Sequence, residues 1–307
     1  MTPETTPLPD SRLYTFIDGE RRFALYFLEG QKLIHDLALT HNVRGEGFAW
    51  FRDVVLSFQP LIGLLKHGEQ FGLYIDSEKP FFRLKIEAAH GGATRCALLP
   101  EEFSRFPEAM HGLVRCQKLF PGNRSPYLSL LKVEGLPLGA IVNRVLDESY
   151  QVHSAVQLSG KSDQSAMLHQ LPPIRDEYEY SEIALASRRT GLSDRLQDLL
   201  DRGLTDRDGI VAGFGEIGFR FLADRPIRFS CSCSRERVIH SLKSLGEQDR
   251  NDLFEPDRDS LETVCEYCKS AYEIHRSDLA GDRSGPNCHG ADLVLAGAGD
   301  RVPCVVG

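Results

Sequence analysis

Four of the eight cysteines in this 307-residue chain stand in two tight pairs, Cys231 with Cys233 and Cys265 with Cys268. Zn²⁺ in structural sites takes four thiolate ligands in a tetrahedron, and a short pair supplies two of them from one backbone turn. The segment between the pairs, residues 234–264, then closes a small module around the metal. The pattern therefore predicts a compact zinc-binding domain with these four cysteines as ligands.

Three uses of such a site remain open from the spacing alone: a structural zinc site, a redox switch, and a catalytic or nucleic-acid-binding finger. Metal-bound thiolates are also the oxidisable form of cysteine, so structure and sensing are compatible. A catalytic zinc needs an open coordination position, which four cysteines normally fill. Neither His240 nor His275 stands at a spacing that demands a place among the ligands. Zinc-assisted hydrolysis is therefore disfavoured.

Composition narrows the class of protein further. Apolar residues make up 41% of the chain, which excludes wholesale disorder, and 36 basic against 44 acidic residues give a net charge of −8. This charge repels phosphate backbones and anionic membrane surfaces, so neither nucleic acid nor a membrane is expected as a partner. The first residues resemble no secretory signal, and the most apolar stretch, residues 54–65, is too short to span a bilayer. We expect a cytoplasmic protein, in which cysteines serve as metal ligands or redox thiols rather than as structural disulfides.

Hydrophobic patterning predicts an α+β protein with five consecutive parts. Residues 1–11 are a frayed terminus, and residues 12–175 form a mixed sheet-and-helix domain with a hairpin at 71–75 and 81–86 and a helical segment at 136–146. Residues 176–228 are a helical linker of low packing stability, in which Ser193 begins a short helix. Residues 229–280 form the zinc domain, where Ser234 begins a helix and 261–267 are a strand. Residues 281–307 are a flexible tail.

The weaker signals predict no catalytic and no organic-cofactor site. Gly213, Gly215 and Gly218 match the dinucleotide-binding glycine pattern, but the strand and helix that this pattern needs are missing, so we expect a loop. Cys96 and Cys116 are expected as buried apolar residues of the first domain. Cys288 and Cys304 are expected as accessible thiols of the tail, with no assigned role.

The zinc-domain region also resembles a known protein family. The runs PIRFSCSCSRERV at 226–238, SLG at 244–246 and TVCEYC at 263–268 closely resemble the heat shock protein 33 family of redox-regulated chaperones. The match is dense over about residues 219–280. Weaker similarities are PY at 126–127, EG at 134–135 and MLHQLP at 167–172.

The resemblance implies an ATP-independent holdase that is inactive while reduced and zinc-bound. It implies one zinc per chain held by Cys231, Cys233, Cys265 and Cys268, and oxidation of the four to disulfides that pair Cys231 with Cys233 and Cys265 with Cys268. It further implies unfolding proteins as clients, a homodimer as the active form, and residues 12–175 as the dimerisation and substrate-binding domain. The linker would loosen together with the zinc domain and release apolar surface. The alternative is a zinc-stabilised protein-interaction module without redox switching.

Two departures from the family pattern affect these expectations. The family usually carries Tyr-Phe-x-x-Ser-Glu-Gln where this chain has YQVHSAV at Tyr150 to Val156. After the second cysteine pair the family generally has a glycine, where this chain has Lys269 followed by Ser270. We expect a slightly distorted turn that still binds metal.

Overall fold

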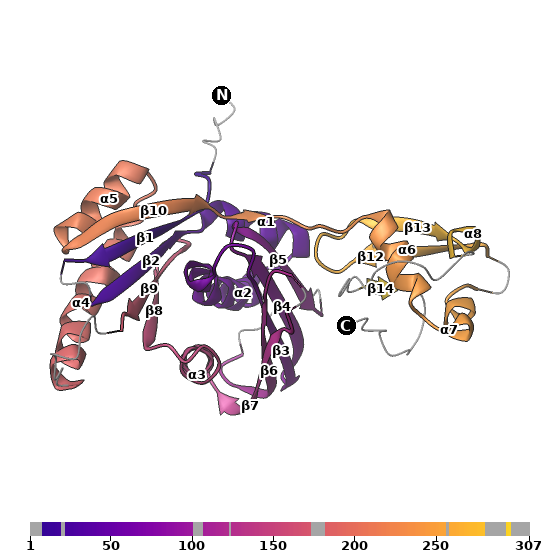
Figure 1. The fold of residues 1–307 in the computed structure, drawn as a ribbon, viewed down its shortest axis with the longest axis horizontal. Coiled ribbons are helices and arrows are strands. Elements are labelled where there is room, and N and C mark those ends of the chain that lie inside the picture. The colour runs from indigo at the N-terminus through magenta and orange to yellow at the C-terminus, as the bar shows by residue number, and fades with distance from the viewer. Residues whose placement is uncertain are drawn as a thin grey trace. The chain divides into compact units, whose positions relative to one another are not determined.

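The computed structural model describes residues 8–19, 22–100, 107–122, 124–172, 182–255, 258–279 and 293–295, with the backbone alone for 182–190 and 293–295. The chain divides into two compact units, residues 1–230 and 231–307. The first unit holds two sheets and several helices, and the second holds the paired cysteines (Figure 1). The predicted α+β class is confirmed.

A five-stranded sheet forms one side of the first unit. Its strand order is β10-β1-β2-β9-β8, and all neighbours pair antiparallel. Its strands are β1 (Arg12–Asp18), β2 (Phe23–Glu29), β8 (Ser154–Leu158), β9 (Gln164–Gln170) and β10 (Phe219–Pro226). Strand β2 is buried along its whole length, because both faces of this sheet are covered.

A six-stranded sheet forms the other side of the unit, in the order β11-β5-β4-β3-β6-β7. The predicted hairpin is confirmed as β3 and β4, and all pairings are antiparallel except the short parallel pair of β11 and β5. The strands are β3 (Gln70–Lys79), β4 (Phe81–Ala89), β5 (Ala93–Leu99), β6 (Met110–Leu119), β7 (Tyr127–Leu136) and β11 (Arg228–Phe229).

The main hydrophobic core lies between the two sheets, around α2 (Figure 1). Trp50, Phe51 and Phe58 on α2 are fully buried, and the ring of Trp50 meets Phe82 of β4 edge-on at 4.6 Å between centroids. The helix predicted at 136–146 is present but begins at Leu138, after Pro137, as α3 followed by one π-helical turn. The helices of this layer are α1 (Gln31–His41), α2 (Gly45–Phe58), η1 (Gln59–Leu64), α3 (Leu138–Arg144) and η2 (Val145–Ser149).

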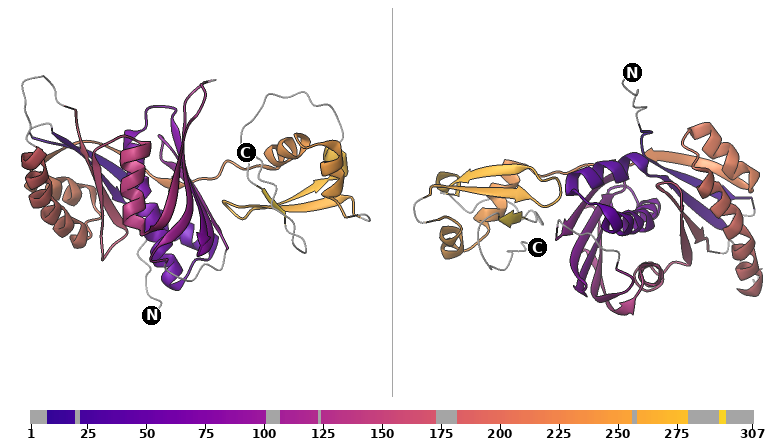
Figure 2. Two further views of the ribbon diagram at one scale, coloured as in Figure 1. Left: turned by 90° about the horizontal axis from the view of Figure 1, so that it is seen from below. Right: turned by 180° about the vertical axis from the view of Figure 1, so that it is seen from behind.

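Two helices, α4 (Glu182–Arg202) and α5 (Arg207–Glu216), cover the outer face of the five-stranded sheet. We call residues 191–217 the covering segment. Figures 1 and 2 show the resulting layers: covering helices, sheet, central helices, second sheet. Leu196, Leu199 and Leu200 of α4 and Ile210 and Phe214 of α5 are buried against the sheet. The predicted linker thus contains two helices that pack on the first unit, followed by β10, a strand of the same sheet.

Two local predictions in this region are wrong. Ser193 lies inside α4 rather than at its start, because the charged residues before it are helical as well. Gly213 and Gly215 lie in α5 rather than in a loop. Asp206 caps this helix by accepting the N–H of Gly209, and the buried Ile210 and Phe214 supply the tertiary packing that outweighs low glycine helix propensity.

The second unit has a small three-stranded sheet, in the order β13-β12-β14, with short helices beside it. Ser234 begins its first helix as predicted, by accepting the N–H of Arg237, and the predicted strand is present as β12. Five described residues form its buried core: Val238, Leu242, Phe254, Ile274 and Leu279. The elements are α6 (Arg235–Lys243), α7 (Glu247–Asp252), β12 (Ser260–Cys265), β13 (Ala271–His275), α8 (Arg276–Leu279) and β14 (Leu293–Leu295).

The two predicted chain ends are only partly within the described residues. Of residues 1–11, the structure describes 8–11, where the buried Ser11 accepts the N–H of Leu33 at 3.0 Å. Of the tail, only the strand β14 is described, and Cys288 and Cys304 lie outside the described residues. No helix among the described residues is both long and apolar enough to cross a membrane.

Candidate metal centre

The two cysteine pairs approach each other from different parts of the second unit. Cys231 and Cys233 lie in the extended segment just before α6, whereas Cys265 ends β12 and Cys268 lies in the turn to β13. All four sulfur atoms lie within 4.8 Å of one another. The Sγ atoms of Cys231 and Cys265 are 3.8 Å apart, and those of Cys233 and Cys268 are 3.1 Å apart. The four predicted site residues are therefore brought together.

This spacing fits a shared metal ion better than disulfides. A zinc ion with Zn–S bonds of about 2.3 Å requires sulfurs about 3.8 Å apart at the edges of its tetrahedron. A disulfide requires about 2.05 Å, well below either distance. Within the described part of the chain, no other group of three or more Cys, His, Asp or Glu side chains is placed to hold a metal. The four-cysteine cluster can hold a metal ion.

The pKa values of two cluster thiols indicate that these sulfurs lose their protons only when a cation is bound. A hydrogen bond with Cys231, followed by burial, raises the pKa of the Cys265 thiol far above its usual value. Burial is also the main cause that raises the pKa of Cys233 to about 11. Without a cation the sulfurs of Cys233 and Cys265 would stay protonated at neutral pH, so binding of a divalent metal must release protons from them.

Neighbouring groups donate hydrogen bonds that suit charged sulfurs. The backbone N–H groups of Tyr267 and Cys268 point at the Cys265 sulfur and counteract part of the rise in its pKa. The hydroxyl of Tyr272 lies 3.0 Å from the Cys233 sulfur and lowers the pKa of that thiol, whereas the Cys268 thiol donates to the Ser270 hydroxyl at 3.2 Å. The sequence analysis missed both hydroxyl groups. The sequence could have indicated them by their positions, two and four residues after Cys268, where the chain turns into β13.

The turn after Cys268 places a lysine in a backbone conformation that favours glycine. Lys269 adopts a left-handed conformation with φ of 60°, which favours glycine and costs a lysine about 1 kcal/mol. The turn is closed by hydrogen bonds of 2.9 Å from the Lys269 N–H to the Cys265 carbonyl and from the Cys265 N–H to the Ser270 carbonyl. These bonds compensate for the strained residue, so the sulfur of Cys268 still faces its partners.

The cysteines of the cluster are more exposed to solvent than the described cysteines of the first unit. Cys231, Cys233 and Cys268 are half-buried, and Cys265 is buried. Cys96 and Cys116 are buried in the first unit as predicted, where burial raises the pKa of both thiols, that of Cys116 to about 11. Among the described cysteines, a small oxidant in water therefore reaches the cluster first.

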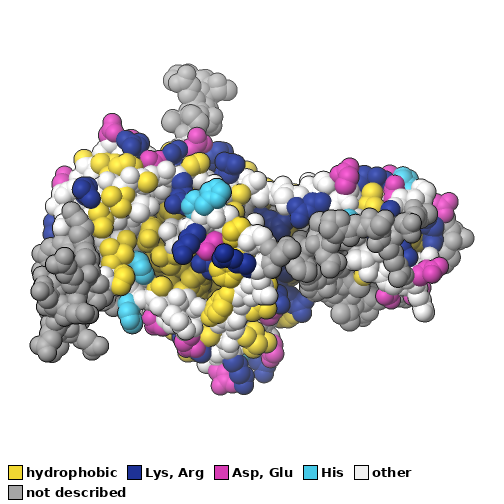
Figure 3. Space-filling view, in the orientation of Figure 1, with side chains coloured by type: hydrophobic (Ala, Val, Ile, Leu, Met, Phe, Trp, Pro, Cys, Tyr) yellow, Lys and Arg dark blue, Asp and Glu magenta, His cyan; other side chains and the backbone are white. Residues whose placement is uncertain are grey.

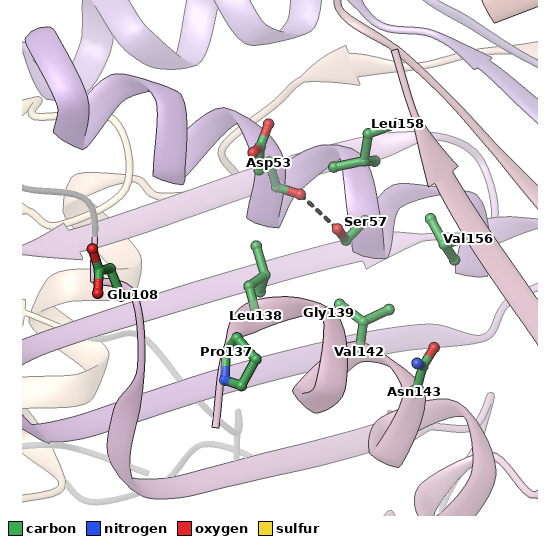
Figure 4. A pocket seen from close by; sticks show the side chains of 10 residues that line it. All are labelled: Asp53, Ser57, Glu108, Pro137, Leu138, Gly139, Val142, Asn143, Val156 and Leu158. Atoms are coloured by element: carbon green, nitrogen blue, oxygen red, sulfur yellow. Dashed lines mark hydrogen bonds between the residues drawn. The ribbon is translucent and has the colours of Figure 1, made fainter. Parts of the chain in front are cut away.

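A separate hollow of about 370 Å³ lies in the first unit between α2, α3 and β8 (Figure 4). Its walls are mainly apolar, with Leu138, Val142 and Val156 among them. Asp53 and Ser57 contribute polar groups from α2, but the Ser57 hydroxyl donates to the Asp53 carbonyl oxygen at 2.7 Å. The hollow therefore offers space for an apolar group rather than an activated nucleophile.

Comparisons with known proteins agree on one family. The family model described as Hsp33 protein matches residues 11–275. The 33 kDa chaperonin of Pseudomonas fluorescens is 29% identical over 292 residues, which is 90% of this chain and 94% of that protein. The 33 kDa chaperonin of Caldanaerobacter subterraneus is 28% identical over 166 residues, so the chain spans only 55% of that relative's length.

A similar fold occurs in a solved structure. The crystal structure of the 33 kDa chaperonin, a heat shock protein 33 homolog, from Thermotoga maritima aligns with a TM-score of 0.66 at 14% identity. The alignment covers 88% of this chain and 96% of that one. At this identity the similarity concerns the fold alone.

Proposed function

Since this chain belongs to the Hsp33 protein family, we propose that it is an ATP-independent holdase chaperone, switched on by oxidation of a zinc-bound four-cysteine centre. The proposal rests mainly on the convergence of Cys231, Cys233, Cys265 and Cys268 within 4.8 Å. In the reduced state these four thiolates would hold one zinc ion. The clients would be unfolding proteins, and the active form a homodimer in the cytoplasm.

The small size of the second unit supports a metal-dependent fold. Five buried side chains among its described residues form a limited core, and small domains of this size commonly need a metal or disulfides. Structural zinc contributes about 10–16 kcal/mol of apparent binding energy, which becomes folding energy when no site exists in the unfolded chain. Loss of the metal should therefore unfold this unit.

The proposed switch is the oxidation of the four thiolates by a peroxide. Two thiolates give two electrons to one hydrogen peroxide molecule and form one S–S bond, and two protons convert the reduced peroxide to two water molecules. Two such steps yield the proposed disulfides, Cys231 with Cys233 and Cys265 with Cys268. Disulfide sulfurs are poor zinc ligands, so the ion leaves when its thiolates are consumed.

Release of apolar surface is the proposed link to client binding. The covering segment hides phenylalanines and leucines on the outer face of the five-stranded sheet. We propose that unfolding of the second unit loosens β11 and β10, which precede it directly in the chain, and then the covering segment. Hydrophobic side chains already reach the surface on the face drawn in Figure 3, and Phe81, Leu128 and Leu130 are among the exposed ones of the first unit. Such surface suits unfolded clients.

The test is light scattering by a chemically unfolded client diluted into buffer with this protein. The zinc-loaded reduced form is compared with the peroxide-treated form, and zinc release and free thiols are counted in parallel. We expect suppression of aggregation by the oxidised form alone, with one zinc released as four thiols disappear. Equal suppression by both forms, with zinc retained, would indicate the alternative, a zinc-stabilised interaction module without redox switching.

A further inference from the structure

A buried carboxyl group lies on the sheet face beneath the covering segment. Side chains at odd positions of β2, such as Leu25 and Phe27, face α4 and α5. Glu29 ends this row and is only 1% exposed. An ionised carboxylate in such a place is costly, because it loses its water and needs several hydrogen-bond donors instead.

The hydrogen bonds around Glu29 leave one carboxyl oxygen and one amide oxygen without donors. Glu29 Oε1 accepts only the N–H of Gln31, at 3.3 Å, and its Oε2 has no partner. Gln164 stands directly opposite Glu29 in the pairing of β2 with β9, and it is fully buried. Its Oε1 also has no partner. Side chains opposite each other on one face of a sheet are neighbours, so two adjacent buried side chains each carry an oxygen without a donor.

The other end of the Gln164 amide fixes its orientation and reaches the covering segment. Gln164 Nε2 donates to the carbonyl oxygen of Leu204 at 2.7 Å. A carbonyl only accepts, so the amide nitrogen must face Leu204 and the amide oxygen is left for Glu29. Leu204 lies in the connection between α4 and α5.

The charged groups nearby do not supply a cation for Glu29. On β1, Arg12 stands opposite Glu29 but is bonded to Asp224 of β10, and Arg207 of α5 also pairs with Asp224. Tyr14 of β1 faces the same cluster. Asp163, which precedes β9, adds a second negative charge and is itself paired with Arg52. Burial and then Asp163 raise the pKa of Glu29 to about 7, although the Gln31 N–H opposes this.

We propose that Glu29 is held protonated beneath the covering segment and donates its proton to Gln164 Oε1, so that docking of this segment on the sheet depends on pH. One proton then satisfies both unpartnered oxygens, and the chain Glu29, Gln164, Leu204 joins β2 through β9 to the covering segment. Glu29 is a positioning residue in this arrangement.

The direction of the pH effect follows from the two states of the segment. When the segment opens, Glu29 meets water and its pKa falls toward the ordinary value of 4.5. Below that pH the carboxyl is protonated in both states and nothing changes. Between pH 4.5 and about 7 opening releases a proton, so the opening constant rises up to about tenfold for each pH unit. Above about pH 7 the Glu29 carboxyl is ionised in both the closed and the open state, so the opening constant no longer changes with pH.

Hydrogen exchange of the reduced, zinc-loaded full chain tests this, read from the backbone amides of residues 191–217 after correction for the intrinsic exchange rate. We expect the opening constant to rise by about 40-fold from pH 5 to pH 7 in the wild type, since pKa values of 4.5 and about 7 bound the transition. In Glu29→Gln it should be nearly independent of pH, because the amide can donate to Gln164 Oε1 at every pH. Glu148→Gln, at an exposed carboxylate paired with Arg144, is the matched control and should keep the wild-type slope.

Infrared spectroscopy of the wild type provides a second measurement that does not depend on the folding of any variant. The carbonyl band of a buried protonated carboxyl should persist at pH 6 and disappear as the pH rises through about 7. A pH-independent opening constant in the wild type, or loss of that band near pH 4.5, would overturn the proposal. Neither experiment uses an oxidant or a client, so its failure is distinct from failure of the proposed chaperone function.

Discussion

At the scale of single residues, the chemistry of this chain depends on which groups surround each sulfur. The described cysteines of the first unit are enclosed by apolar side chains, which suppress the thiolate form. Those of the second unit are crowded by one another and by N–H and O–H donors, which favour the thiolate form once a cation is present. The same residue type is therefore inert in one unit and suited to metal binding in the other.

Removal of one sulfur should abolish metal binding. We expect Cys265→Ser to lose its zinc and to leave the second unit unfolded under reducing conditions, because a hydroxyl is a poor zinc ligand and the core there is small. Metal analysis and far-ultraviolet circular dichroism measure this. Cys96→Ala, at a buried thiol of the first unit, is the control and should keep its zinc. A normal zinc content in Cys265→Ser would refute the ligand assignment.

The hydroxyl of Tyr272 should slow the oxidation of Cys233. In the zinc-loaded form the Cys233 sulfur would already be a thiolate, and a hydrogen bond worth about 1.5 kcal/mol would lower its reactivity, so its loss in Tyr272→Phe should speed oxidation by peroxide about tenfold. Timed alkylation followed by mass spectrometry gives the rate at each cysteine. Tyr127→Phe, at an exposed tyrosine of β7, should leave the rate unchanged. An unchanged rate in Tyr272→Phe would mean that this hydroxyl does not protect the thiolate.

At the scale of elements, the covering segment is held on the first unit by few buried side chains. It contributes Leu196, Leu199, Leu200, Ile210 and Phe214 to one side of a sheet whose other side faces the main core. Each such side chain contributes about 1.5–3 kcal/mol on burial, and fixing the backbone opposes this. Elements with few buried side chains open at lower free energy than the core does.

Truncation of Phe214 should open the covering segment selectively. The ring of Phe214 lies 4.7 Å from that of Phe16 and 4.9 Å from that of Phe27, measured between centroids. Phe214→Ala should cost about 3–5 kcal/mol and raise hydrogen exchange in residues 191–217, while the six-stranded sheet keeps its protection. Leu222→Ala, at an exposed position of β10, should change little. Uniform loss of protection throughout the first unit would contradict a separately opening segment.

At the scale of the whole molecule, the two units differ in what stabilises them. The first unit has a continuous core between two sheets, whereas the described core of the second has five residues beside the cysteine cluster. Hydrophobic burial therefore suffices for the first unit, whereas we expect the second to depend on a metal bound by the cysteine cluster.

Removal of zinc by a chelator should unfold the second unit and leave the first unit folded. A strong zinc chelator under reducing conditions should abolish hydrogen-exchange protection in residues 231–279 and leave β2, β3 and β4 protected. Adding zinc back should restore the protection. If the unit had unfolded for a reason other than loss of the metal, zinc would not restore it. Retained protection of the second unit without metal would show that its core suffices by itself.

The sequence determined the features that depend on local pattern. The spacing of Cys231, Cys233, Cys265 and Cys268 predicted the cluster, because two short pairs can place four sulfurs around one ion in few ways. Alternation and turn residues predicted β3 and β4, and Ser234 predicted the start of α6. Each cysteine pair, the hairpin turn and the helix start are patterns of a few neighbouring residues.

The tertiary structure decided the features that depend on residues far apart in the chain. The weak apolar stripe of α4 gave no sign that it covers a sheet, because its partners on β1, β2 and β9 are distant in sequence. The glycines of α5 predicted a loop, and the packing of Phe214 outweighed them. The pair of Glu29 and Gln164 exists only through strand register, since a shift of one residue would turn either side chain to the opposite face. Local pattern thus specified the four-cysteine cluster, and long-range packing specified the covered face and the carboxyl group beneath it.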